Sequence, residues 1–102
     1  MEETILKIIR PTVKGKKYTA IIVERKTKKE RKISFGSIGY SQYKDQTPLK
    51  LYSSNNSLDM KRRKAYFNRH SNEDTKAEAL SKEIAKSGGR YNAKILSHKY
   101  LW

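Results

Sequence analysis

The chain has 102 residues, of which 24 are Lys or Arg and ten are Asp or Glu, so its formal net charge is +14. A length of 102 residues fits a single domain with a modest core. The chain contains no cysteine, which excludes disulfide bonds, thiolate zinc sites and a cysteine nucleophile.

The first third of the chain predicts a small antiparallel sheet. Residues 4–10 and 17–24 are short runs rich in Ile, Val, Thr and Tyr, and a proline and a glycine lie between them. Residues 25–32 are strongly charged and are typical of a hairpin tip, after which an alternating pattern at 33–35 predicts a third strand. Because short strands alone are marginally stable, we expect helices on the apolar face.

A long loop and three helices are expected after the sheet. Residues 36–57 are rich in Gly, Ser, Asn, Gln and Tyr, and a loop of this length is either functional or mobile, or else a tolerated surface insertion. Ser57 is a candidate N-cap for a helix over residues 58–69. A Ser-x-x-Asp pair that begins at Ser71 resembles a capping box and precedes a second helix, which ends before two glycines.

The second helix is predicted over residues 74–86, and a last helix over 91–102 carries large side chains at i, i+4, i+7 and i+11. These elements predict one basic α+β domain over residues 1–102: a small three-stranded antiparallel sheet with two or three helices packed on one face. The strands lie within 4–35, the loop at 36–57 and the helices at 58–102.

Two segments concentrate the positive charge, and an excess of this size indicates a polyanionic partner. The hairpin segment 25–32 has six basic residues and one acid, although such a tip can also serve only to keep a sheet edge soluble. The helical segment 61–69 has five basic residues, no acid, and aromatic residues among them, which favours binding to nucleic acid. The predicted phosphate-binding residues are Arg25, Lys26, Lys28, Lys29, Arg31 and Lys32 in the hairpin and Lys61, Arg62, Arg63, Lys64 and Arg69 in the helix.

We expect the fold to gather these two segments into one shared positive platform. Such a platform neutralises phosphates through counterion release and does not read the base sequence. Nucleic acid is therefore the first expected partner, and the sequence does not distinguish DNA from RNA.

Signatures of catalysis are missing from the sequence. It has no GxSxG, HExxH or P-loop pattern, so we predict a non-enzymatic protein without a cofactor. The two histidines, His70 and His98, have no carboxylate pair at ligand spacing, so we predict no metal site and a core or boundary position for His98. A metal-dependent nuclease assembled from Asp45, Asp59 and Glu73 is a weaker alternative.

Four stretches occur in an order that resembles one protein family. They are residues 15–20, 33–43, 63–70 and 89–102, and the most specific part is the pairing of FGxxGYSxY with YxxRH. This pattern is similar to the small basic uncharacterised proteins encoded by nucleocytoplasmic large DNA viruses. The present chain differs in having Gln42 where the family usually has Asp.

The resemblance implies a viral origin and a location in the virion, the host cytoplasm or the viral factory. Together with the charge, it predicts a virion-associated protein that binds nucleic acid. The alternative is a minor capsid, or cement, protein that docks on acidic surfaces of the major shell protein. No stretch approaches the roughly 18 apolar residues of a membrane span, and the first residues lack the features of a signal peptide, so no membrane partner is expected.

Overall fold

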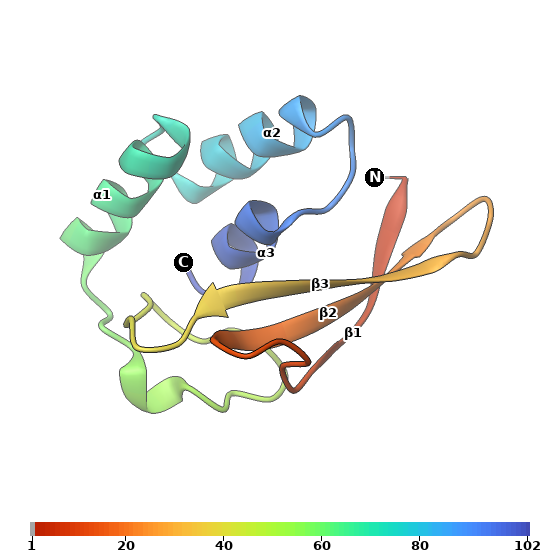
Figure 1. Cartoon of the computed structure of the whole chain (residues 1–102). Helices are drawn as coiled ribbons and strands as arrows, with labels where there is room; N and C mark the ends of the chain where they lie inside the picture. The colour runs from red at the N-terminus through yellow and green to blue at the C-terminus, as the bar shows by residue number, and fades with distance from the viewer. Residues whose placement is uncertain (1) are drawn as a thin grey trace.

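The computed structural model describes residues 2–102, and in this range it contains one three-stranded sheet and three α-helices (Figure 1). The strands are β1 (Glu3–Ile9), β2 (Lys16–Glu24) and β3 (Glu30–Ser37), in the order β1-β2-β3 with both pairs antiparallel. The helices are α1 (Met60–Ser71), α2 (Lys76–Lys86) and α3 (Ala93–Tyr100). The predicted α+β fold with a three-stranded antiparallel sheet is confirmed.

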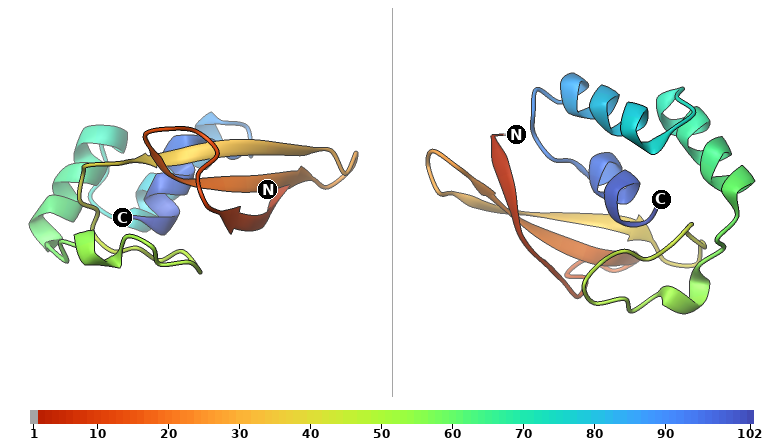
Figure 2. Two further views of the ribbon diagram at one scale, coloured as in Figure 1. Left: turned by 60° about the horizontal axis from the view of Figure 1, so that its bottom comes forward. Right: turned by 180° about the vertical axis from the view of Figure 1, so that it is seen from behind.

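The core lies between the sheet and α3. Tyr18, Ala20 and Ile22 alternate along β2, so their side chains point to the same face, and all three are fully buried. Phe35 of β3 and Leu96 of α3 complete this cluster. The helix α3 packs on the sheet, α2 packs on α3, and α1 packs on α2, all on the same side of the sheet (Figure 2).

The third strand begins earlier than the sequence pattern predicted. Residues 30–37 pair with β2, so Arg31 lies opposite Ile22 and Lys32 opposite Ile21. The hairpin tip is therefore limited to residues 25–29. Pairing with the long β2 extends the strand into charged residues, because an exposed edge strand tolerates charged side chains.

All three predicted helices begin two residues too early, and the observed caps show where each helix starts; Asn92 caps α3. Asp59, rather than Ser57, caps α1: its carboxylate accepts from the N–H groups of Lys61 and Arg62, while the left-handed φ of +52° at Leu58 prevents an earlier start. Thr75 caps α2, and the proposed cap Ser71 is instead the last residue of α1. Asp59 and Thr75 directly precede their helices, whereas Ser57 lies three residues before Met60 and Ser71 lies five residues before Lys76.

The segment between β3 and α1 is an ordered part of the fold, built around the buried carboxylate of Asp45. It contains one short 3₁₀ helix, Ser53–Asn55. Asp45 Oδ2 accepts from Tyr18 Oη (2.5 Å) and from the N–H of Tyr52 (3.1 Å), and Oδ1 accepts from the N–H and hydroxyl of Thr47 (3.0 and 2.7 Å). Burial opposes ionisation, but these donors hold the pKa of Asp45 below its usual range.

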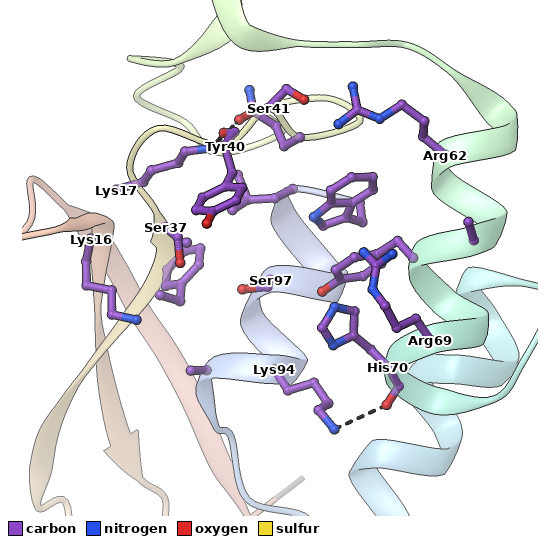
Figure 3. A pocket seen from close by; sticks show the side chains of 18 residues that line it. Lys16, Lys17, Ser37, Tyr40, Ser41, Arg62, Arg69, His70, Lys94 and Ser97 are labelled. Atoms are coloured by element: carbon purple, nitrogen blue, oxygen red, sulfur yellow. Dashed lines mark hydrogen bonds between the residues drawn. The ribbon is translucent and has the colours of Figure 1, made fainter.

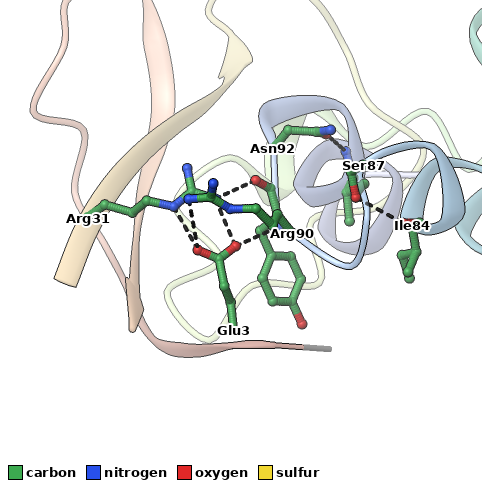
Figure 4. A network of polar contacts seen from close by, with 8 residues as sticks. Glu3, Arg31, Ile84, Ser87, Arg90 and Asn92 are labelled. Carbon is green, nitrogen blue, oxygen red and sulfur yellow. Dashed lines mark hydrogen bonds and ion pairs between the residues drawn. The ribbon is translucent and has the colours of Figure 1, made fainter. Parts of the chain in front are cut away.

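A second buried carboxylate, Glu3, joins the edges of the fold (Figure 4). Its oxygens accept from Nε and Nη2 of Arg31, both at 2.8 Å, and from the N–H of Tyr91 at 2.8 Å. The hydrogen bonds from Arg31 are the main reason that the pKa of Glu3 lies below its usual range. Glu3 thereby connects β1 to β3 and to the link between α2 and α3.

Gly36 is required where β3 passes the end of the chain's last helix. Its φ is +77°, and a Cβ there would lie 2.9 Å from Leu101 Cδ1 and 3.1 Å from Lys17 Cβ. We expect Gly36→Ala to lower the free energy of unfolding by about 3 kcal/mol, since steric crowding adds to backbone strain. Gly39→Ala is the control, because Gly39 also has a positive φ but has open space around it, and it should cost only about 1 kcal/mol. Urea denaturation followed by circular dichroism measures both; equal losses would contradict the close contact.

Candidate anion-binding cleft

The two predicted basic segments lie at opposite ends of the molecule. In all views of Figures 1 and 2 the tip of the β2–β3 hairpin projects away from the helices, whereas α1 lies beyond the other end of β3. The longest dimension of the molecule is 41 Å. The expected shared platform is therefore wrong, because β3 runs from one basic segment towards the other and separates them.

The hairpin cations differ in their availability. Arg31 is bound to Glu3 in two hydrogen bonds, so its charge is already neutralised within the fold. The other predicted residues of this segment are exposed to solvent; they are Arg25, Lys26, Lys28, Lys29 and Lys32.

The basic residues of α1 point in different directions. Arg62 and Arg69 are seven positions apart, which is close to two helical turns, and both line a cleft together with Ala65. Lys61 and Lys64 are exposed and do not line this cleft. The helical rotation of about 100° per residue thus divides a continuous basic cluster between two surfaces.

Arg63 is used inside the fold. Its Nε donates to the carbonyl oxygen of Trp102 at 2.9 Å. Its guanidinium carbon lies 4.9 Å from the ring centroid of Tyr43, within the range of a cation–π contact. Arg63 therefore holds the end of the chain and the β3–α1 segment against α1, and its interpretation as a free phosphate ligand does not fit this geometry.

The cleft has a volume of about 650 Å³ and lies between the end of β3, the segment that follows it, α1 and α3 (Figure 3). Five of its lining residues are basic: Lys16, Lys17, Arg62, Arg69 and Lys94. No Asp or Glu is among the described residues that line it. A concave surface with charges of one sign focuses the electrostatic field and attracts anions.

Three of these cations are available to a ligand. The side chains of Lys16, Arg62 and Arg69 form no hydrogen bond or ion pair with any residue in the range 2–102. Figure 3 shows Lys94 at the same opening, with its Nζ 3.2 Å from the carbonyl oxygen of His70. Since they come from β2, α1 and α3, these charges surround the opening.

Lys17 is buried and positions one wall of the cleft. It is 2% exposed, and its Nζ donates to the carbonyl oxygen of Tyr40 at 2.6 Å and to Gln42 Oε1 at 2.5 Å. Burial lowers the pKa of Lys17, while Asp45 acts in the opposite direction. The lysine therefore fixes residues 40–42 beside the cleft.

Aromatic side chains form much of the remaining wall. Trp102 stacks on Tyr66, with ring centroids 4.2 Å apart and an interplanar angle of 5°. Tyr40 lines the same cleft but is 73% exposed. The cleft thus combines a packed aromatic wall with one largely unpacked tyrosine ring.

A chain of buried hydrogen bonds supports the wall from behind. Tyr66 Oη lies 2.9 Å from His98 Nδ1, His98 Nε2 lies 2.7 Å from Ser71 Oγ, and Ser71 donates to Glu83 at 2.8 Å. Because the Ser71 hydrogen points to Glu83, the serine oxygen accepts from Nε2–H, and His98 is a neutral imidazole that accepts from Tyr66. Burial lowers the pKa of His98 to about 4. His98 is fully buried, so of the predicted core or boundary positions it occupies the core.

The three acids of the nuclease alternative serve the fold at separate places. Asp45 accepts four hydrogen bonds, Asp59 caps α1, and Glu73 lies 3.9 Å from Lys82. Among residues 2–102 there is no group of three or more His, Asp or Glu side chains arranged to hold a metal ion. In the same range, no helix has the length and apolar character needed to cross a bilayer.

Comparisons of the chain with models of protein families, with curated proteins and with solved structures found no match. The resemblance to viral proteins therefore stays a prediction, and the function must be inferred from the cleft itself. Sequence reasoning missed Lys16, Lys17, Tyr40 and Lys94 as site residues. All four lie within the stretches that carry the resemblance, but no spacing in the sequence places them together at one site.

Proposed function

We propose that the protein is a non-enzymatic nucleic-acid-binding protein that holds phosphates at this cleft. The observation that supports the proposal is a concave surface with five basic side chains and no lining carboxylate. Phosphate neutralisation by such side chains releases condensed counterions and gives affinity without sequence preference.

The cleft cations suit phosphate ligands in their chemistry. Arg62 and Arg69 carry planar guanidinium groups, which can bind phosphate oxygens in pairs, and Lys16 adds a compact charge from the opposite wall. Lys61 and Lys64 are exposed on the same helix and extend the positive field beyond the cleft. A nucleic-acid strand that enters the cleft thus meets additional cations along α1.

The salt dependence of binding tests this proposal. If about four phosphates are engaged, the slope of log affinity against log salt should be near −3 for a single strand. Removal of two cations in Arg62→Ala/Arg69→Ala should weaken binding about tenfold or more and make the slope less steep by about one to two. Fluorescence anisotropy with a labelled oligonucleotide at several salt concentrations measures both quantities.

The matched control is Lys28→Ala/Lys29→Ala, which removes two exposed cations from the hairpin tip at the other end of the molecule. It should change affinity much less than the cleft variant. A larger loss in the hairpin variant would move the binding surface away from the cleft. A slope near zero would reject phosphate neutralisation altogether.

The resemblance to viral proteins adds a location to the proposal. We propose that the protein is associated with the genome in the virion; the host cytoplasm and the viral factory are the other locations that the resemblance implies. Fractionation of purified particles tests this: the protein should separate with the nucleic acid when the shell is opened at low salt, and it should be released as salt is raised.

A minor capsid protein is the second candidate, and exposed apolar side chains favour it. Leu49, Leu51, Leu58 and Met60 are 40%, 39%, 60% and 59% exposed, and all belong to the stretch that ends at the start of α1. Apolar residues beside charged ones are typical of surfaces that dock on another protein. Density for this chain within the shell of a particle, with this stretch against the major capsid protein, would support the alternative.

A further inference from the structure

The size of the cleft limits which form of nucleic acid can enter it. Its volume of about 650 Å³ falls in the range of pockets that enclose small molecules. A duplex cannot place a base in such a space, because its bases are paired and stacked inside the helix. An unpaired nucleotide has both a free base and a phosphate, and it has the size of the small molecules that a cleft of this volume encloses.

Tyr40 offers a ring on which a base can stack. Its side chain is 73% exposed, while its carbonyl oxygen is held by the buried Lys17 at 2.6 Å. The backbone is therefore fixed and the ring remains largely free of packing. Figure 3 shows Tyr40 on the wall opposite Arg62 and Arg69, so a base on its ring would place the attached phosphate towards α1.

The two arginines of the cleft are spaced so that they can contact successive phosphates of a nucleic-acid strand. Arg62 and Arg69 are seven residues apart on one face of α1, which corresponds to about 10 Å along the helix axis. Lys16 reaches the same opening from the start of β2. Since none of these three side chains has a partner within residues 2–102, each can bind a phosphate without breaking an existing contact.

We propose that the cleft binds an unpaired nucleotide of a single-stranded nucleic acid, with the base stacked on Tyr40 and the phosphates held by Lys16, Arg62 and Arg69. This inference rests on the proposed function and specifies its substrate class. Stacking accepts every base because each has a π face, so the site selects single strands without selecting a sequence. The same contacts serve single-stranded DNA and RNA.

The single tryptophan of the chain, Trp102, lines the cleft and reports on its occupancy. The experiment titrates the full chain with unlabelled oligo(dT) and oligo(U) strands of about 12 nucleotides and with a duplex of equal length. Tryptophan fluorescence measures binding in the cleft, and anisotropy of labelled strands measures binding anywhere on the protein. Tyr40→Ala and Tyr40→Phe are the test and control variants.

Single strands should change the Trp102 fluorescence and bind about tenfold or more tightly than the duplex. Tyr40→Ala should weaken single-strand binding about tenfold while leaving duplex binding unchanged, because a stacked base contributes about 1–3 kcal/mol. Tyr40→Phe keeps the ring and should bind like the unchanged protein. Because the side chain of Tyr40 is mostly exposed, both variants are expected to fold, and circular dichroism checks this.

The possible results distinguish failure of the single-strand inference from failure of the proposed nucleic-acid binding itself. If single strands bind with a steep salt dependence but leave Trp102 fluorescence and the affinity of Tyr40→Ala unchanged, the cleft is not the single-strand site, and the inference is overturned while nucleic-acid binding stands. If duplex and single strands bind equally, selection of unpaired nucleotides is overturned in the same way. If no nucleic acid binds at any salt concentration, the proposed function itself fails. A change in Trp102 fluorescence with oligo(dT) or oligo(U), together with the loss of affinity in Tyr40→Ala, supports the inference.

Discussion

Asp45→Asn is expected to lower the free energy of unfolding by about 3 kcal/mol, a large part of the roughly 5–15 kcal/mol available to a small domain. The side chain is 2% exposed, and both of its oxygens accept hydrogen bonds from neighbouring donors. An asparagine keeps one accepting oxygen and replaces the other with an NH₂ group. The new group faces either Tyr18 and Tyr52 or the two donors of Thr47, so at least two buried hydrogen bonds are lost.

Asp74→Asn is the matched control, because Asp74 is exposed and accepts a single hydrogen bond, from Asn68. It should change the free energy of unfolding by less than about 0.5 kcal/mol. Urea denaturation near neutral pH compares the two variants. Similar small losses for both would show that Asp45 does not organise the β3–α1 segment. Because this segment also carries Tyr40, we expect Asp45→Asn to weaken single-strand binding as well.

Stability should fall as the pH is lowered from 6.5 towards 4, by on the order of 3 kcal/mol in total from His98. Burial lowers the pKa of this imidazole from 6.5 to about 4, so in this interval the unfolded chain binds more protons than the folded chain. Stability therefore rises with pH across the window and is fully present above pH 6.5. Protonation of Nδ1 would also break the hydrogen bond that it accepts from Tyr66.

Other titratable groups near the His98 imidazole determine the pH interval in which the contribution of the histidines can be measured. The pKa of His70 is lowered by burial, with Arg69 and Lys94 adding to the effect, so its contribution has the same sign. The pKa of Glu83 is also below its usual 4.5, which moves its contribution to lower pH. The interval from pH 6.5 to 4.5 thus isolates the histidines.

His98→Gln tests the assignment to one residue, with His70→Asn as the control. His98→Gln should be less stable near neutral pH, because its hydrogen bonds are imperfect, but its stability should depend little on pH between 6.5 and 4.5. His70→Asn should keep most of the dependence. Denaturation midpoints across this range give the comparison, and a flat profile for the unchanged protein would contradict a neutral buried His98.

The sheet and the helices could be predicted from the sequence because their patterns are local. The run of β-branched and aromatic residues in β2 is typical of a buried strand, and the helical spacing in α2 and α3 reflects the period of a helix. Their ends could not be predicted as well. The start of β3 at Glu30 depends on pairing with β2, and the helix start at Met60 depends on a left-handed residue, Leu58, that no pattern marks.

The cleft was predictable only in part, because charge density does not say which way a side chain points. Arg62 and Arg63 are adjacent in the same basic run, yet one lines the cleft and the other packs against Tyr43. Lys16 and Lys94 meet only because α3 lies on the sheet. Contacts between distant segments follow from the topology, which the composition of each segment does not contain.

The separation of the two basic ends determines how the protein carries its charge. At physiological ionic strength the screening length is about 8 Å, a small fraction of the 41 Å length of the molecule. Like charges at the two ends therefore hardly repel each other, and the repulsion that accompanies the net charge of +14 acts mainly within each basic end. At about 0.01 M salt the screening length grows to about 30 Å, and occupation of one end by an anion then changes the electrostatic potential at the other.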